Sequence, residues 1–305
     1  MKRRIESTVA PRDAGKTLLA MLAERFTYRS EDEWKERIRR GELSVNERSA
    51  APETLLAAGD AVRYQPEDLV EPPVRSDFRI VRKEADFLVI DKPGNLPVHP
   101  AGPYFEHTLW GLLHEECPEL HFVNRLDRET SGLLLAARSA SGAAILSKQL
   151  PTMFKRYLVI VHGAFAGQVR AEGTLVRDEA SAVRKKRRFL SGGETGERAV
   201  TELRELRQVR GFTLVEAVLH TGRFHQVRAT LSSLGFPVVG DKLYGPDENL
   251  YRKLRGDRLD AEDRARLILD RQALHCAELG FRHPVSGEEL RFASPLPPEM
   301  AALLE

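Results

Sequence analysis

Two oppositely charged side chains stand just before a turn-forming segment and an apolar run. Arg125 and Asp127 precede a TSG turn at 130–132, and the run GLLLAA follows at 132–137. The apolar run predicts a buried strand, so the carboxylate and the guanidinium are expected in a loop at its start, where a rigid scaffold can hold functional groups. Because an isolated aspartate before a turn more often accepts hydrogen bonds from turn amides, a catalytic interpretation depends on further signatures.

Other chemical patterns in the chain are incomplete. AGKT at 14–17 resembles the end of a phosphate-binding loop, but the first glycine of that loop would stand at Ala10. No G-x-S-x-G sequence is present, so nothing supports an α/β-hydrolase. A metal-like group consists of His107, His114, Cys117 and His121. Its spacing matches no common zinc pattern, so we expect no metal site and no cofactor.

The first sixty-odd residues predict a small helical unit that ends in a strand. Apolar residues at helical spacing favour a helix over 15–26, and Ser30 is typical of the N-cap of a second helix that ends at Gly41. A short strand and turn follow, and then a strand after a turn at 59–60. The Pro72-Pro73 pair breaks any helix. We therefore predict a domain over 1–66, a linker over 67–77 and a second domain over 78–305.

The second domain alternates strands with fewer helices. Strands are predicted on both sides of a turn at 83–86 and over 132–138, 154–163, 199–209 and 212–220, the last two joined by a hairpin at 210–211. Helices are predicted over 139–150 and 224–235, and an exposed, charged helical stretch over 249–275. This pattern predicts an α+β fold with a mixed, mostly antiparallel sheet flanked by helices.

Composition excludes several classes of protein. The 305 residues contain 47 Lys and Arg against 45 Asp and Glu, a net charge of +2 that excludes a histone-like polycation. The only cysteines, Cys117 and Cys276, exclude a disulfide framework and a four-cysteine zinc site. Neither a signal peptide nor an apolar run long enough to cross a bilayer is evident. We expect a cytoplasmic, monomeric protein with no membrane partner.

Several ordered motifs in the chain are similar to those of the RluA-type family of RNA pseudouridine synthases. The segments that carry this resemblance are FLVIDKPGNLPVHP (87–100), RLDRETSG (125–132), FKRYLVIVHG (154–163), TGRFHQVRATLSSLGFPVVGDKLYG (221–245) and LHCAELGFRHPVSGEELRFASPLP (274–297). The resemblance covers about 78–298, and the N-terminal unit resembles an S4 RNA-binding domain. It implies the fold of a pseudouridine synthase and the isomerisation of specific uridines without a cofactor.

The resemblance implies three catalytic residues. Asp127 matches the catalytic aspartate, whose carboxylate can attack or stabilise the electron-poor sugar carbon. Arg223 matches the arginine expected to pair with Asp127 and to lower its pKa, although alone it could be a surface arginine at a helix start. Tyr157 matches a tyrosine that can stack on the detached uracil and act as a base or hold a water that does. An aromatic residue that fills the core face of a strand would have the same sequence pattern.

RNA contacts are also implied. The target uridine must leave its stack, and Arg125 matches the arginine that enters the vacated space. The run RKKRR at 184–188 has flanks of loop composition and is expected to hold phosphates, although such runs are often only solvated loops. The residues expected to bind substrate or RNA are Arg125, Asn124, Thr130, His225, Gln226, Arg228, Arg184, Lys185, Lys186, Arg187, Arg188, Arg37, Arg39 and Arg40.

The sequence departs from the family pattern at two places. Asn124 stands where the family most often has His, and asparagine cannot be protonated near neutral pH. In the S4-like unit, acidic residues at 31–33 replace residues that are often basic, and Glu47 stands where glycine is common. The RNA affinity of this unit is therefore expected to be weak, or to be used only beside the catalytic domain.

Three functions stay open at this point. The S4-like unit favours an enzyme that modifies large-subunit ribosomal RNA, by association with similar proteins. A transfer-RNA pseudouridine synthase is the alternative within the class. A non-catalytic RNA-binding or ribosome-assembly factor on the same fold is the alternative outside it, and the presence of Asp127, Tyr157 and Arg223 is evidence against that.

Overall fold

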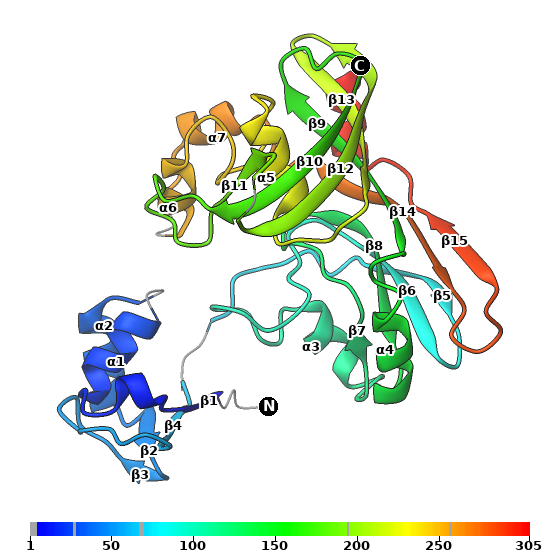
Figure 1. Cartoon of the computed structure of the whole chain (residues 1–305). Helices are drawn as coiled ribbons and strands as arrows, with labels where there is room; N and C mark the ends of the chain where they lie inside the picture. The colour runs from blue at the N-terminus through cyan, green and yellow to red at the C-terminus, as the bar shows by residue number, and fades with distance from the viewer. Residues whose placement is uncertain (1–4, 27–28, 67–69, 194, 256–257) are drawn as a thin grey trace. The chain divides into compact units, whose positions relative to one another are not determined.

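The computed structural model describes residues 5–26, 29–66, 70–193, 195–255 and 258–305 (Figure 1). The chain divides into two compact units: Met1–Pro72 with Ala101–Phe105, and Pro73–Pro100 with Glu106–Glu305. The division falls between the two prolines of the predicted linker, of which residues 67–69 lie outside the described residues. Each unit has its own cluster of buried hydrophobic side chains.

The first unit packs two helices and a four-stranded sheet around its own core. The sheet order is β1-β4-β2-β3. The elements are β1 (Ile5–Thr8), η1 (Pro11–Asp13), α1 (Leu18–Arg25), α2 (Glu31–Arg39), β2 (Leu43–Val45), β3 (Arg48–Ser49) and β4 (Ala61–Tyr64). Leu18, Leu22, Trp34 and Ile38 are buried, as the periodicity predicts, and Met21 is buried beside them.

Local interactions define both ends of α2. Ser30 and Glu33 form a reciprocal capping box at its start, and Gly41 follows its end with a φ of +76°. The acidic residues Glu31, Asp32 and Glu33 occupy the first turn, where negative charge favours the helix dipole. These acids therefore have a structural reason for their positions, independent of any RNA contact.

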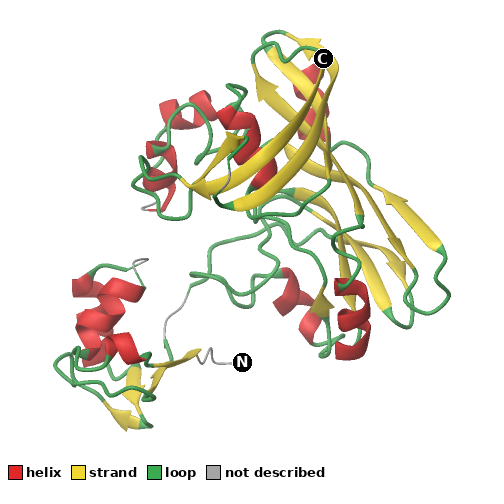
Figure 2. Ribbon diagram, in the orientation of Figure 1, coloured by secondary structure: helices red, strands yellow, loops and turns green. Residues whose placement is uncertain are grey.

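The second unit is built on an eleven-stranded, mostly antiparallel sheet (Figure 2). The path of strands is β11-β10-β12-β13-β9-β14-β8-β6-β5, with β15 paired to β14 and β7 to β8. The strands are β5 (Arg79–Lys83), β6 (Phe87–Lys92), β7 (His121–Phe122), β8 (Ser131–Ala137), β9 (Phe154–His162), β10 (Gln168–Arg177), β11 (Arg187–Ser191), β12 (Glu197–Val209), β13 (Phe212–Leu219), β14 (Leu274–Arg282) and β15 (Glu289–Ala293). Among the described strands, only β8 and β14 pair in parallel.

Helices pack against the sheet at two separate places. Helix α5 contacts β10, β11 and β12, whereas α4 contacts β7 and β8. The helices of this unit are α3 (Leu109–His114), α4 (Ala140–Ser147), α5 (Gln226–Ser233), α6 (Asn249–Arg255), α7 (Ala261–Leu267), α8 (Pro298–Ala301) and η2 (Ala302–Leu304). This α+β architecture, with helices flanking a mixed sheet, confirms the predicted fold class.

Two local predictions need correction. The run at 184–188 was expected in a loop, but Arg187 and Arg188 begin β11, which pairs with β10. The stretch 249–275 was expected to be an exposed helix, yet it contains two short helices and ends in the buried residues Arg271–His275. Residues 256–257 of that stretch lie outside the described residues. Its last residues are buried because they enter β14, next to the centre of the sheet.

Candidate active site

The parallel pairing of β8 with β14 brings two loops together at one edge of the sheet. Ser131 is the register partner of His275, so the residues just before each strand become neighbours. Asp127 lies in the loop before β8, and Gln272 lies just before β14. Nε2 of Gln272 donates to Oδ2 of Asp127 at 3.4 Å and to Oγ1 of Thr130 at 2.5 Å. The carboxylate is thus positioned by chain segments from both strands.

Arg228 connects Asp127 to a second, fully buried carboxylate. Nη1 of Arg228 donates to Oδ2 of Asp127 at 2.7 Å. Nε and Nη2 of the same guanidinium donate to Oδ2 and Oδ1 of Asp241 at 2.6 and 2.8 Å. The side chain of Asp241 is 0% exposed, whereas that of Asp127 is 26% exposed. Asp241 therefore fixes the guanidinium, and Asp127 is the carboxylate that a substrate can reach.

The electrostatic surroundings keep Asp127 ionised. Burial by itself would raise the pKa of this carboxyl. The charge of Arg228 is the largest opposing influence, and together with His225 and the hydrogen bonds from Arg228 and Gln272 it outweighs burial and lowers the pKa of Asp127 from 3.8 to about 2. The site therefore presents a carboxylate, not a carboxylic acid, at neutral pH.

The prediction that Arg223 pairs with Asp127 is wrong. The exposed side chain of Arg223 donates through Nε to the backbone oxygen of Arg198 at 3.1 Å. It precedes α5, whereas Arg228 lies in the first turn of that helix, on the side that meets the loop of Asp127. Both arginines belong to the segment 221–245. Arg228 forms the ion pair because α5 presents its side chain to the loop of Asp127.

Arg228 and four other residues predicted to contact RNA form contacts within the protein. Thr130 is held by Gln272, and buried Gln226 exchanges hydrogen bonds with Thr221, Thr201 and the backbone of 200 and 223. The imidazole of His225 is 4% exposed and lies with Nε2 3.8 Å from Oδ1 of Asp127. Buried Asn124 accepts a hydrogen bond from the backbone N–H of Leu135 at 2.7 Å, so it connects the start of the Asp127 loop to β8.

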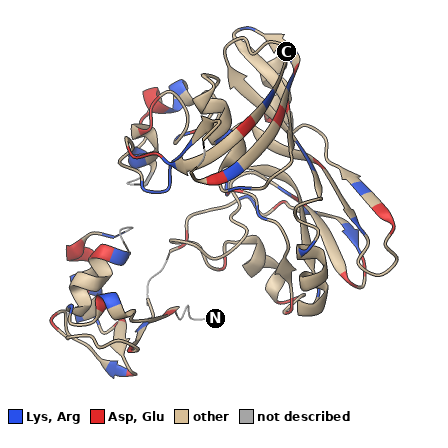
Figure 3. Cartoon of the chain, in the orientation of Figure 1, with Lys and Arg blue, Asp and Glu red and all other residues tan. Residues whose placement is uncertain are grey.

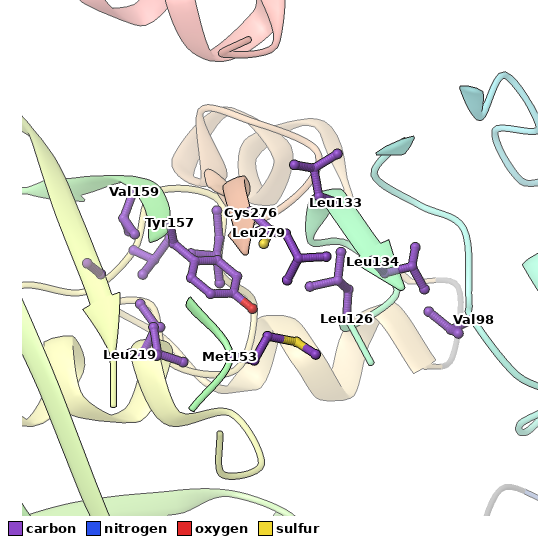
Figure 4. Close-up of a cluster of buried hydrophobic side chains, with 14 of the residues drawn as sticks. Val98, Leu126, Leu133, Leu134, Met153, Tyr157, Val159, Leu219, Cys276 and Leu279 are labelled. Atoms are coloured by element: carbon purple, nitrogen blue, oxygen red, sulfur yellow. The ribbon is translucent and has the colours of Figure 1, made fainter. Parts of the chain in front are cut away.

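Tyr157 lies in β9, in a largely apolar environment beside the site. Figure 4 shows its ring among Leu126, Met153, Leu219 and Cys276, with its hydroxyl toward Met153 and Leu126. Burial, the neighbouring Cys276 and the charge of Asp127 raise the pKa of Tyr157 well above 10. The side chain is therefore a neutral phenol at neutral pH, electrostatically coupled to Asp127.

A second layer of buried charges supports the loop of Asp127 and was not predicted. Nζ of Lys92 donates to the backbone oxygens of Pro93, Leu96 and Arg128 at 2.7, 2.9 and 3.2 Å. Burial, followed by the charge of Arg271, lowers the pKa of Lys92 to about 7. Nζ of Lys242 donates to Oε2 of Glu129 at 2.8 Å.

Most of these unpredicted residues lie in segments that already carry the resemblance. Lys92 belongs to 87–100, and Asp241 and Lys242 belong to 221–245. A charged residue inside an apolar run is the signal that could have found them, because such a residue needs a buried partner. Gln272 lies just before the segment 274–297, and nothing in the local sequence indicates that it belongs to the site.

The basic residues predicted to bind RNA differ in their availability. Arg125 is exposed, and among the described residues no hydrogen bond or ion pair involves its side chain. At the start of β11 (Figure 3), Arg184, Lys185 and Arg188 are exposed, whereas Lys186 pairs with Glu248 at 2.7 Å. The charge of Lys185 contributes to lowering the pKa of His225, so this run lies close to the site.

On α2 of the first unit, the three predicted arginines also differ. Arg37 pairs with buried Glu42 at 2.5 Å, and Arg40 pairs with Glu36 at 3.1 Å. Arg39 is exposed. In the nearby turn, Asn46 and Glu47 have positive φ values of 48° and 66°, the conformation that explains why glycine would suit position 47.

The described part of the chain contains neither a group of metal-ligating side chains nor a helix that could span a membrane. There, no three His, Cys, Asp or Glu side chains are grouped so that they could hold a metal ion. In the same residues, no helix has both the length and the apolar composition that crossing a membrane requires.

The chain is similar in sequence and in fold to proteins of one family. The family model described as RNA pseudouridylate synthase matches residues 86–233. The chain is 33% identical to the ribosomal large subunit pseudouridine synthase D of Xanthomonas campestris pv. campestris, covering 98% of this chain and 91% of that protein. It is 31% identical to the RNA pseudouridine synthase YlyB of Bacillus subtilis, covering 92% of each chain. The structure of human RNA pseudouridylate synthase domain containing 1 aligns with a TM-score of 0.58 and 26% identity over 74% of this chain and 86% of that one.

Proposed function

Because this chain belongs to the RNA pseudouridine synthase family, we propose that it converts specific uridines of large-subunit ribosomal RNA to pseudouridine, with Asp127 as the catalytic carboxylate. The observation that carries the proposal is the ionised carboxylate of Asp127, 26% exposed and held through Oδ2 by Arg228. Its other oxygen, Oδ1, receives no hydrogen bond from any described residue and is free to meet a substrate.

The reaction is an isomerisation, so its atoms balance without a cofactor. The bond between C1′ and N1 of the uridine breaks, and a bond between C1′ and C5 of the same uracil forms. The proton on C5 is lost, and N1 gains a proton. Oδ1 of Asp127 attacks or stabilises the electron-poor C1′ while the uracil turns.

Tyr157 and Arg125 have distinct proposed roles at the flipped uridine. Tyr157 contacts the detached uracil as a neutral phenol, because its raised pKa is incompatible with a resting phenolate base. Arg125 has a free, exposed guanidinium two residues from Asp127, and it stacks in the space left by the uridine.

Exposed cations near the site supply the sequence-independent part of RNA affinity. Arg184, Lys185 and Arg188 are exposed at the start of β11, and they hold backbone phosphates on the approach to the site. The first unit, which resembles an S4 domain, adds a weaker contact through Arg39, since Arg37 and Arg40 are paired with glutamates. The names of several relatives specify the ribosomal large subunit, which favours its RNA as the target over transfer RNA.

Site-resolved mapping of pseudouridine in total RNA tests both which RNA is modified and whether Asp127 is needed. Cells without the gene are compared with cells complemented by the wild type, by Asp127→Asn or by Asp270→Asn. The control alters a carboxylate that is 85% exposed. We expect the gene's loss to remove pseudouridine from large-subunit ribosomal RNA, and the wild type and Asp270→Asn to restore it.

Two results would contradict different parts of the proposal. Loss of pseudouridine in transfer RNA alone would show that the target is wrong. Full restoration by Asp127→Asn would show that this carboxylate is not catalytic, and a growth or assembly defect without any lost pseudouridine would favour a non-catalytic RNA-binding factor.

A further inference from the structure

His225 has an unusual place at the start of α5. Its backbone has a φ of 59°, in the left-handed region that a non-glycine residue seldom adopts. This turns the imidazole into the site, where it stacks on Phe224 with 3.7 Å between ring centroids. Each ring nitrogen then has one defined neighbour. Nδ1 lies 2.9 Å from the hydroxyl oxygen of Tyr244, and Nε2 lies 3.8 Å from Oδ1 of Asp127.

The hydrogen bonds of Tyr244 determine which nitrogen of His225 carries the proton. The backbone N–H of Arg187 can only donate, and it does so to the Tyr244 oxygen at 2.9 Å. The phenol proton is then available for Nδ1 of His225, and among the described residues no other acceptor competes for it. Because Nδ1 accepts, the proton of a neutral imidazole must lie on Nε2, on the side of Asp127.

The surroundings also favour the neutral imidazole. Burial lowers the pKa of His225, and the positive charges of Arg228 and Lys185 lower it further. The carboxylates of Asp127 and Asp241 oppose this effect but do not outweigh it, and the resulting pKa is about 3. His225 is therefore uncharged at neutral pH.

We infer that His225 is a catalytic hydrogen-bond donor, locked by Tyr244 as the Nε2–H tautomer, and that it donates to a ribose oxygen of the uridine at Asp127. This inference rests on the proposed function. The separation of 3.8 Å between Nε2 and Oδ1 is too long for a direct hydrogen bond. It is short enough for one substrate oxygen to lie about 2.9 Å from Nε2 and beside Oδ1. Attack of Oδ1 at C1′ would bring the neighbouring 2′-hydroxyl oxygen to this position, and hydrogen bonds to that hydroxyl strengthen in the transition state of glycosidic cleavage.

The tautomer can be observed without any turnover. Long-range ¹H–¹⁵N correlation spectra of the full-length protein labelled with [¹⁵N]histidine distinguish the Nε2–H, Nδ1–H and doubly protonated forms, and His225→Gln identifies the signals of His225. We expect the Nε2–H form without titration between about pH 5 and 8. In Tyr244→Phe, which retains an aromatic ring beside Arg228, we expect a mixture of tautomers. A wild-type signal of the Nδ1–H or imidazolium form would overturn the inference.

Rate measurements test the donation to the substrate. Single-turnover rates are measured on large-subunit ribosomal RNA transcribed in vitro, which carries no pseudouridine. We expect His225→Leu to slow the reaction about a hundredfold with little change in RNA affinity, as when one preorganised donor is removed. We expect His225→Gln, whose amide N–H can reach the position of Nε2, to recover at least part of the rate.

The outcomes separate this inference from the proposed function. A rate of His225→Leu equal to that of the wild type, or a rate of His225→Gln no higher than that of His225→Leu, would contradict the donor role. If instead Asp127→Asn keeps full activity while the wild-type spectrum shows the Nε2–H form, the role of Asp127 fails and the tautomer assignment stands.

Discussion

Arg228 is the residue on which the two carboxylates of the site depend. Asp241 is fully buried, and besides both contacts with Arg228 it accepts hydrogen bonds from the backbone N–H groups of Leu243 and Tyr244 at 2.9 Å each. This pairing holds the guanidinium rigidly, and its remaining nitrogen, Nη1, faces Asp127. The geometry of the Asp127 carboxylate is thus set by a second carboxylate, Asp241, which is fully buried.

Replacing Arg228 should weaken both the fold and the reaction. In Arg228→Met, Asp241 becomes a buried charge without its cation, so the free energy of unfolding should fall by about 3–5 kcal/mol. With burial left as the main influence, the pKa of Asp127 should rise from about 2 to above its usual 3.8. The ionised form would then be lost at a higher pH, so activity should decline on acidification sooner than in the wild type. Urea denaturation and a pH profile of the single-turnover rate measure both effects.

Arg223→Met is the matched control for Arg228→Met. Its side chain is exposed, and its one hydrogen bond to a described residue is to the backbone oxygen of Arg198, so the free energy of unfolding should change by no more than about 0.5 kcal/mol. Arg228→Lys is the second variant, in case Arg228→Met does not fold, because it keeps a charge but cannot contact both carboxylates as a fork does. Equal effects of the changes at 223 and 228 would argue against the assigned ion pair.

The residues of the site differ in how well the sequence reveals them. Asp127 can be identified from its motif and from its place before an apolar strand. The choice between Arg223 and Arg228 cannot be made this way, because it depends on the rotation of α5 relative to a loop a hundred residues earlier. Gln272 is even harder to identify from the sequence, since only the pairing of β14 with β8 brings it to Asp127.

At the scale of elements, the close approach of β8 to β14 depends on one glycine. Gly132 has a φ of +107°, which side chains rarely adopt. A Cβ at this position would lie 2.3 Å from the backbone oxygen and 2.6 Å from the backbone nitrogen of Cys276. No flexible side chain can move aside there, because both atoms belong to the neighbouring strand.

Gly132→Ala should therefore separate the two strands that position the site. We expect the free energy of unfolding to fall by at least about 3 kcal/mol, from backbone strain together with steric overlap. Gly211→Ala is the matched control, because Gly211 also has a positive φ, of +84°, but has no atom within 4 Å of the added Cβ. There we expect a loss of only about 1–2 kcal/mol. Equal losses in urea denaturation would mean that strain alone, without the close approach, explains the effect.

Most individual elements follow from local patterns, but their pairing does not. The fully buried β8, the serine-capped α4 and the hairpin of β12 and β13 lie where the sequence predicts them. β10 and β11 were not predicted, because charged residues and Gly173 interrupt the alternation of β10. The parallel contact of β8 with β14 joins residues more than a hundred positions apart, and no local pattern encodes it.

At the scale of the whole molecule, each unit has a core of its own and one of the two tryptophans. Trp34 is 1% exposed in the core of the first unit, and Trp110 lies in α3 of the second. The first unit is small, and a small domain buries a lower fraction of its surface on folding. The two units are therefore expected to differ in stability.

Tryptophan fluorescence can follow each unit separately during urea denaturation. In Trp110→Phe the remaining Trp34 reports the first unit, and in Trp34→Phe the remaining Trp110 reports the second. We expect the Trp34 signal of Trp110→Phe to change at a lower urea concentration and with a smaller dependence on urea, because less surface becomes exposed. Circular dichroism of both variants serves as the control. Coincident transitions in both variants would show that the chain unfolds as one cooperative unit.

The hydrogen bond between Gln272 and Asp127 joins positions 145 residues apart, and this separation has a consequence for the order in which the enzyme becomes competent. A nascent chain that ends before residue 272 would already contain the motifs at 87–100, 125–132, 154–163 and 221–245. It would still lack β14, and with it the neighbour that closes the loop of Asp127. The full set of side-chain hydrogen bonds to Asp127 is therefore assembled only after residue 272 has been translated, and a shorter copy would hold this carboxylate through Arg228 alone.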